Sequence, residues 1–312
     1  MRALGEHDGP ALLRSIFDKG TAPQVERTLE VAVRLAEAPR GADLVALALV
    51  PSYGRLVDRS TQQARGETSR PGSEAMAVAL GRAHTSVLTD ERVGRLPLEA
   101  QSQLSAYADR LGDLLVEHGS SSIARVIFEQ AAGIDERKLR LEPGNTTYRR
   151  DVSISYDKLA DLALAAGRSG DAEQLYRQAL QVAEDLTRLE PGNTTYRRDV
   201  SISYERLADL AVRAGTFDVA LELANRAVAG REALAAVEPT RRDFAVELGF
   251  ALYLRYAIRS AAGDPSAGSD PRQTEATLAP FEANDLLDAR GQAILDWSRS
   301  QGAADTEDPG NV

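Results

Sequence analysis

Residue types that commonly perform chemistry are sparse in this sequence. The three histidines, His7, His84 and His118, do not have metal-ligand spacing, and cysteine is absent. No glycine-rich phosphate loop, GxSxG motif or HExxH motif occurs. His118 directly precedes Gly119 at the expected end of a helix, where the helix dipole favours a histidine. We therefore predict no catalytic residue, no metal site and no cofactor, and a protein that is not an enzyme.

Acidic residues form the constellation with the most regular spacing. They occur as pairs four residues apart, so both carboxylates of a pair lie on one face of a helix. The six residues are Asp109, Asp113, Asp157, Asp161, Glu205 and Asp209. Like charges at this spacing destabilise a helix by roughly 0.2–0.5 kcal/mol per pair, so a compensating interaction is expected.

Two interpretations of the acidic row remain open. The carboxylates could line a groove whose negative potential attracts a basic peptide. Alternatively, the neighbouring Arg110, Lys158 and Arg206 could neutralise a row that is simply solvated. A metal site is not expected, because carboxylates on separate rigid helices rarely converge to coordination distance.

The elements that position these acids are internal repeats. The stretch "LEPGNTTYRRDVSISY" occurs at Leu141–Tyr156 and again at Leu189–Tyr204, which defines a period of 48 residues. The same displacement aligns residues 109–119, 157–167 and 205–215, so three copies cover residues 98–238. Repeats of this length are typical of stacked supersecondary units.

Each copy has the pattern of a helical hairpin. In the second copy Val152, Tyr156, Leu159 and Ala163 recur at three- and four-residue steps and form one stripe of a helix, which we call helix A. Gly167 stands where a left-handed helix cap favours glycine. A second apolar stripe, helix B, follows and ends at the next "EPGN".

These positions resemble the tetratricopeptide repeat (TPR). Its first helix reads aromatic-x2-Leu-Gly/Ala-x2-aromatic and its second reads Ala-x3-aromatic-x2-Ala. The matching residues are Tyr156, Leu159, Ala172, Tyr176 and Ala179 in the second copy, Tyr204, Leu207 and Ala220 in the third, and Leu111, Gly112, Ala124, Phe128 and Ala131 in the first. The repeat exceeds the usual length of about 34 residues, and Ala224 replaces an aromatic. It resembles the long-repeat variant found in actinobacterial multidomain proteins, and the match covers just under half of the chain.

The resemblance implies an all-α solenoid of antiparallel helical hairpins that forms a right-handed superhelix. We expect residues 1–96 to be a helical N-terminal region, with degenerate repeats as one alternative, and residues 97–262 to be the TPR array. The array would contain three clear copies and a decayed fourth that loses four residues. Residues 263–300 would be capping helices and residues 301–312 a disordered tail. The polar segment 60–73 is expected to be a mobile loop or a boundary.

The resemblance also implies a function. Helices A of TPR proteins line the concave face, which places the acidic row in the groove. We therefore predict a protein–protein interaction scaffold that binds a peptide or helix of a partner, and the acidic row would favour a basic one. The alternative is a peptide-sensing regulatory protein with residues 1–96 as effector or dimerisation module. The acids argue against a clamp for a partner's C-terminal carboxylate.

The repeated segments Tyr148–Asp151 and Tyr196–Asp199 are a second candidate site. Their arginines could hold an acidic partner. Alternatively, the tyrosines pack on the neighbouring hairpin, and Arg150 or Arg198 pairs with an acid of the preceding helix B.

Composition narrows the range of partners and locations. The net charge of −10 and the pI of about 5.0 oppose binding to nucleic acid and to anionic membranes. The densest apolar run, Leu44–Val50, is too short to span a bilayer. Lysine occurs only three times, a bias that suggests a bacterial source, and we expect a cytoplasmic location. Oligomeric state and partner identity remain open.

Overall fold

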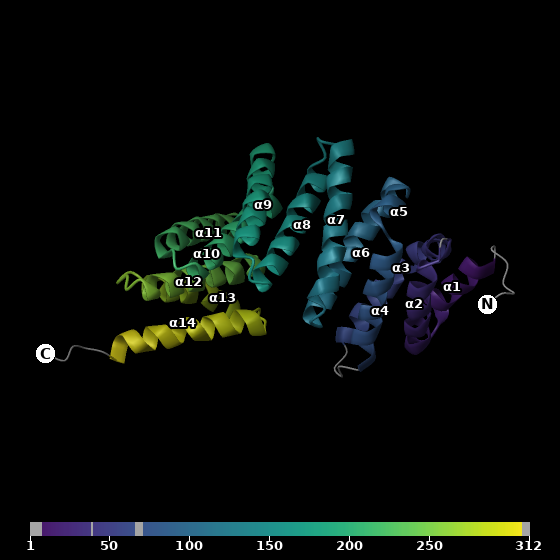
Figure 1. The fold of residues 1–312 in the computed structure, drawn as a ribbon. Helices are drawn as coiled ribbons and strands as arrows, with labels where there is room; N and C mark the ends of the chain where they lie inside the picture. Colours follow the sequence, from purple (N-terminus) through teal and green to yellow (C-terminus); the bar gives the residue numbers. More distant parts are fainter. Residues whose placement is uncertain (1–7, 39, 66–70, 308–312) are drawn as a thin grey trace. The chain divides into compact units, whose positions relative to one another are not determined.

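The structure is a computed structural model that describes residues 8–38, 40–65 and 71–307. All regular secondary structure within these residues is helical, which confirms the predicted all-α class (Figure 1). The helices are α1 (Asp8–Lys19), α2 (Ala22–Ala36), α3 (Gly41–Arg65), α4 (Pro71–Val87), α5 (Asp90–Gly94), α6 (Leu98–Glu117), α7 (Ser121–Leu141), α8 (Thr146–Ala165), α9 (Ser169–Leu189), α10 (Thr194–Arg213), α11 (Phe217–Val237), α12 (Arg242–Ala261), α13 (Ser269–Glu282) and α14 (Ala289–Glu307). The chain divides after Ala166 into two compact units, and each is described by itself.

Helix boundaries repeat at the interval found in the sequence. Helices α6, α8, α10 and α12 each have 20 residues, and their starts lie 48 residues apart. Helices α7, α9 and α11 each have 21 residues at the same interval. The four residues missing between Glu-Pro and Arg-Arg-Asp in the fourth copy therefore do not shorten its helices or change their interval. The turn before α12 is retained, because the amide of Arg241 donates to Glu238 as the amide of Asn193 donates to Glu190, both over 3.0 Å.

Glycine ends each helix A. Gly119, Gly167, Gly215 and Gly263 have φ angles between 69° and 75°, in the left-handed region where a side chain would be strained. After Gly215, the amide of Thr216 donates to the carbonyl of Ala211 over 2.9 Å, which closes a Schellman turn. These glycines set the tight connection between helix A and helix B.

The first unit contains helical hairpins from its N-terminal end onward. Helix α1 packs on α3 and α2 packs on α4, and α3 and α4 in turn pack on α6 (Figure 1). Helix α4 keeps the helix B register, because its buried Met76, Leu80 and Ala83 stand 48 residues before Ala124, Phe128 and Ala131 of α7. One continuous hydrophobic core extends from Phe17 to Leu162. Residues 1–96 thus share their core with the first clear repeat.

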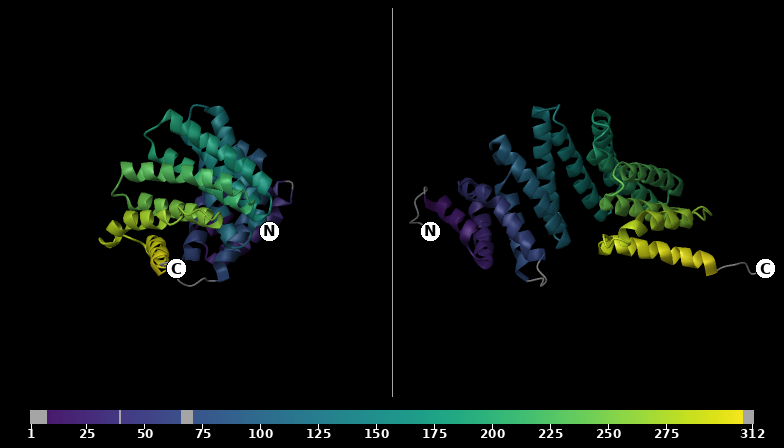
Figure 2. Two further views of the ribbon diagram at one scale, coloured as in Figure 1. Left: turned by 90° about the vertical axis from the view of Figure 1, so that its left-hand side faces the viewer. Right: turned by 180° about the vertical axis from the view of Figure 1, so that it is seen from behind.

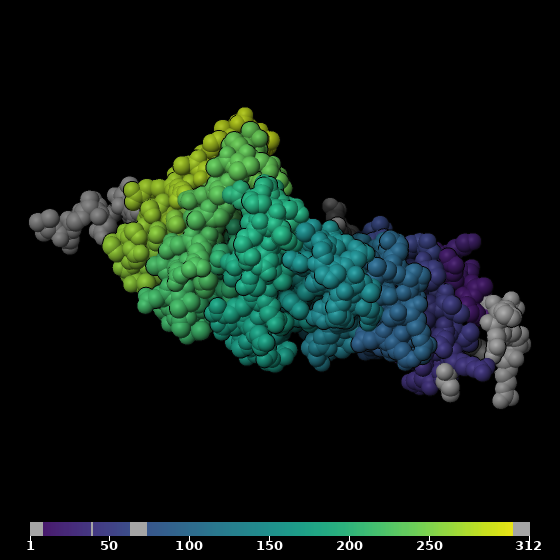
Figure 3. All heavy atoms as spheres, turned by 90° about the horizontal axis from the view of Figure 1, so that it is seen from above, coloured from purple at the N-terminus to yellow at the C-terminus, as the bar shows by residue number. Residues whose placement is uncertain are grey.

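Residues 60–65 and 71–73 of the segment expected to be a mobile loop or a boundary are helical. Helix α3 continues to Arg65 and α4 begins at Pro71, while residues 66–70 lie outside the described residues. In the space-filling view, the helices of the first unit follow one another in the order of the sequence (Figure 3).

The second unit is built on smaller clusters rich in alanine. Ala208, Ala220 and Ala224 pack with Ile258 between α10, α11 and α12. Helices α13 and α14 lie beside α12 (Figure 2), where Leu278 and Leu295 form a further cluster. Helix α14 reaches Glu307, so residues 301–307 of the predicted disordered tail are helical, and residues 308–312 lie outside the described residues.

Candidate functional site

The acids of the first two copies lie on α6 and α8 of the first unit. The ammonium group of Lys158 in α8 contacts the carboxylate of Asp113 in α6, which neutralises that acid and joins the two helices. Asp157 is partly buried and Asp161 is exposed. The other neighbouring base, Arg110, pairs with Asp58 of α3 over 2.7 Å.

Asp109, like Asp157, is partly buried. Its Oδ1 atom is buried and accepts no hydrogen bond among the described residues. Burial raises the pKa of Asp109 to about 7, with a further contribution from the negative charge of Asp135, while Lys158 opposes the rise. Near neutral pH this carboxyl group therefore contributes less than one full negative charge.

The acids of the third copy lie on α10 of the second unit and are paired with the chain's own arginines. Glu205 binds Arg231 of α11 through both carboxylate oxygens, over 2.8 and 3.1 Å. Asp209 accepts a hydrogen bond from Arg213 over 2.7 Å. In both units, therefore, part of the acidic row is already neutralised.

A buried polar centre joins α6, α7 and α8 in the first unit. Asp135 of α7 is 1% exposed and accepts hydrogen bonds from the hydroxyls of Ser105 and Ser155 over 2.8 and 2.9 Å. Lys138 contacts both Asp135, over 3.2 Å, and Asp151, over 2.9 Å. Burial raises the pKa of Asp135, and Lys138 and the two hydroxyls counteract the rise. Sequence reasoning missed this centre, although a lone acid on the apolar stripe of α7 could have indicated it.

The corresponding centre of the second unit has a residue of the opposite charge, Arg231, at the position of Asp135. Arg231 of α11 is 3% exposed and bridges Glu205 of α10 and Glu247 of α12. Glu247 also accepts a hydrogen bond from Nε of Arg198 over 2.7 Å. Of the two arginines for which a pair with the preceding helix B is one interpretation, Arg150 or Arg198, Arg198 instead pairs with Glu247 of the following helix A.

The duplicated stretch makes the same local contacts in both copies. Asn145 and Asn193 cap α8 and α10 by accepting hydrogen bonds from the amides of the following helices. The hydroxyl of Tyr156 donates to Glu136 over 3.1 Å, and that of Tyr204 donates to Glu184 over 2.7 Å. Each tyrosine thus reaches the preceding helix B.

The repeat-packing residues occupy graded positions in the core. Ala172, Ala179 and Ala220 are fully buried, and Tyr176 and Leu207 are nearly so. Tyr156, Leu159 and Tyr204 are half-buried. The buried alanines therefore lie where neighbouring helices pack, at the positions that the TPR pattern assigns to small residues. The hairpins that carry them have a constant length. The protein is a TPR-like helical repeat protein.

No protein-family model and no curated protein matches this TPR-like chain. Among solved structures it is similar to BtubC (BKLC) from P. vanneervenii, with 19% identity, a TM-score of 0.46, and coverage of 92% of this chain and 94% of that one. It is also similar to a Podosopora anserina putative kinesin light chain with nearly identical TPR-like repeats, with 19% identity and a TM-score of 0.46. That match covers 74% of this chain and 96% of the other.

Two of the histidines lie in the core or at a helix end. His84 is 1% exposed, and its Nδ1 lies 2.5 Å from the hydroxyl of Tyr53. Burial lowers the pKa of His84 to about 4, so the ring is neutral near neutral pH. His118 caps the C-terminus of α6, as predicted, and His7 lies outside the described residues.

In the described part of the chain, no group of three His, Cys, Asp or Glu side chains could hold a metal ion. None of its helices combines the length and the apolar character needed to cross a bilayer.

Proposed function

We propose that this protein is a non-enzymatic scaffold that binds a peptide or helix of a protein partner through the acid-bearing faces of its helices A, within either unit. The observation that carries the proposal is that a carboxylate at the same position of the repeat is exposed to solvent in both units. The side chain of Asp113 is 47% exposed in the first unit, and that of Asp209, two periods later, is 45% exposed in the second. The adjacent Leu111 and Leu207 are buried. The same register therefore presents a carboxylate to solvent beside a packed core in both units.

The ion pairs of the row restrict the kind of partner. Lys158 and Arg213 already neutralise Asp113 and Asp209, so a cationic partner must compete with intramolecular pairs that are exposed and weak, worth about 0–1 kcal/mol each. A basic peptide can displace such pairs, and its binding should weaken as salt screens the charges. The continuous core of residues 17–162 favours the scaffold over the alternative in which residues 1–96 are a separate effector module.

The test uses the full chain and two labelled peptides, one rich in Lys and Arg and one rich in Asp and Glu, in fluorescence anisotropy. We expect the basic peptide to bind and the acidic one not to bind. A variant with Asp157→Asn, Asp161→Asn and Asp209→Asn should bind the basic peptide with an affinity at least about tenfold lower, or 1.4 kcal/mol weaker. Glu205 is left intact, because its removal would leave the buried Arg231 without one of its acids.

The matched control replaces three acids of helices B, with Glu129→Gln, Glu173→Gln and Glu222→Gln. Each of these acids pairs with an arginine on its own helix, as Asp209 does. Both variants neutralise three acids, so the net charge changes equally. Equal loss of affinity in both variants, or no difference between the two peptides, would show that the proposal is wrong.

A further inference from the structure

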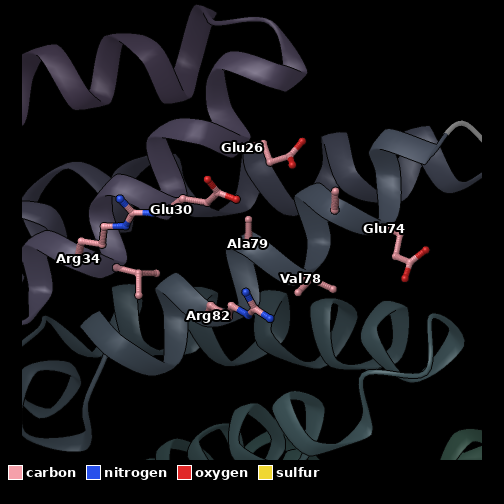
Figure 4. Close-up of a pocket in the computed structure, with 9 residues that line it drawn as sticks. Glu26, Glu30, Arg34, Glu74, Val78, Ala79 and Arg82 are labelled. Carbon is pink, nitrogen blue, oxygen red and sulfur yellow. The ribbon is translucent and has the colours of Figure 1, made fainter.

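A hollow of about 580 Å³ lies between α2 and α4 of the first unit (Figure 4), and none of the acids of α6 and α8 lines it. Val33, Val78 and Ala79 give its surface an apolar part. Five charged side chains also line it. They are Glu26, Glu30 and Arg34 of α2 and Glu74 and Arg82 of α4.

These charges are not paired with one another. Within the described residues, none of the five side chains makes an ion pair or a hydrogen bond. Glu30 and Arg34 have the spacing at which helical residues pair, as Glu173 and Arg177 do in α9 over 2.8 Å. Glu26 and Glu30 repel each other at the same spacing. The groove therefore holds charges that the chain itself does not neutralise.

On each of the two helices, the acids precede the arginine: Glu26 and Glu30 come before Arg34 on α2, and Glu74 comes before Arg82 on α4. Glu26 and Glu74 stand toward the N-terminal ends of α2 and α4, and Arg34 and Arg82 stand toward the C-terminal ends. In Figure 4, Arg34 lies at one end of the lining and Glu74 at the opposite end, with Glu30, Arg82 and Glu26 between them. Glu26 and Arg34 are eight residues apart on one helix, which corresponds to about 12 Å.

We propose that this groove binds an α-helix of a partner protein, antiparallel to α2 and α4, with acidic residues at its N-terminal end and basic residues at its C-terminal end. Its basic end would lie over Glu26 and Glu74, and its acidic end over Arg34 and Arg82. The valines and Ala79 would take the apolar side of the helix.

Length and helix electrostatics determine this choice of occupant. A free amino acid is too short, because its ammonium and carboxylate groups are joined through one carbon, whereas two helical turns span the charges of the groove. A helix with acids first and bases last is also stabilised by its own dipole. A helix of the reverse order would have to lie parallel to α2 and would oppose its own dipole.

The experiment measures fluorescence anisotropy of labelled peptides with the full chain. Two Ala- and Leu-based peptides of identical composition, roughly 18 residues or five turns long, carry glutamates in the first turn and lysines in the last, or the reverse. We expect the peptide with glutamates first to bind at least about tenfold more tightly. Absence of binding, or equal binding of the two peptides, would overturn the proposal.

Matched variants locate the binding. Glu26→Lys with Glu74→Lys should lower the affinity for the preferred peptide at least about tenfold. Glu99→Lys with Glu117→Lys, two exposed acids of α6, makes the same change in net charge and should leave the affinity unchanged. Full affinity in the Glu26→Lys, Glu74→Lys variant, with circular dichroism showing the native helix content, would refute the assignment.

Two other occupants are outcomes of the same experiment. Competition by free lysine or glutamate would indicate a small zwitterion, and a dimer that only the Glu26→Lys, Glu74→Lys variant loses in sedimentation would indicate a second copy; either result overturns the proposal. The triple variant of α8 and α10 described under "Proposed function" should bind this peptide normally. The two proposals can therefore fail separately.

Discussion

Asp135 in the first unit and Arg231 in the second stand two periods apart and occupy the same place on helix B. Both are nearly inaccessible to water, and both join helix A of their own repeat to the next helix A. Two serine hydroxyls and Lys138 hold the carboxylate of Asp135, whereas glutamates on both sides hold the guanidinium of Arg231. One backbone position thus accepts either sign of charge, provided that the neighbouring helices supply the complementary groups.

The balance of charge differs between the two centres. In the second unit, Arg231 and Arg198 face Glu205 and Glu247, so each of these two acids has an arginine partner. In the first unit, Lys138 and Lys158 face Asp109, Asp113, Asp135 and Asp151, so acids are in excess. The raised pKa of Asp109 is the consequence of this excess and of burial. The first centre should therefore respond to pH, and the second to the loss of its cation.

Replacing the buried cation should have the largest effect. Arg231→Met leaves Glu205 and Glu247 without their shared partner, and breaking a buried pair in this way costs about 3–5 kcal/mol. Trp297, the single tryptophan of the chain, lies in the second unit and reports its unfolding in urea through fluorescence.

The control for this prediction removes the acids as well. A triple variant with Arg231→Met, Glu205→Gln and Glu247→Gln should recover most of the loss, because no uncompensated charge remains buried. If the triple variant is as unstable as the single one, packing and not charge governs this centre.

Stability of the first unit should fall as pH rises. The pKa of Asp109 is about 7 in the folded protein and 3.8 in its ordinary state, so the folded protein binds more protons between these values. The stabilisation is complete below pH 3.8 and is lost as pH rises to about 7, by at most about 1.4 kcal/mol per pH unit. Asp109→Asn should remove this slope in urea denaturation followed by circular dichroism.

Asp161→Asn serves as the comparison, because Asp161 is exposed and does not contribute to the pKa of Asp109. That variant should keep the slope, and Trp297 fluorescence should change little with Asp109→Asn. A wild-type protein whose first unit is equally stable at pH 5 and pH 8 would show that Asp109 is hydrated.

The smallest effect should be the same in both units. Asn145→Ala and Asn193→Ala each remove the side chain that caps a helix A, at a cost of about 1 kcal/mol. Hydrogen exchange of the first-turn amides of α8 and α10 should rise by similar factors. Clearly unequal losses would indicate that the duplicated stretch does not act through its local contacts alone.

Local signals in the sequence were sufficient for the helices of the repeats. The duplicated "EPGN" linkers and the glycines after each helix A determined where those helices begin and end, and the structure keeps this interval through α12. Signals outside the repeats were less informative. A polar composition suggested a loop at residues 60–73 and disorder at residues 301–307, whereas α3, α4 and α14 extend into these segments. Helix packing can order a polar end that composition alone assigns to a loop.

The sequence by itself determined the all-α class, the period, and the face on which each acid lies, because these follow from residue type and helical spacing along one chain. Only the tertiary structure decided which charges meet. Arg198 pairs with Glu247, 49 residues later, and Asp135 meets Ser105 and Ser155 on two other helices. Such contacts depend on how neighbouring helices pack and on which groups lose water there, and helical spacing within one segment carries no information about either.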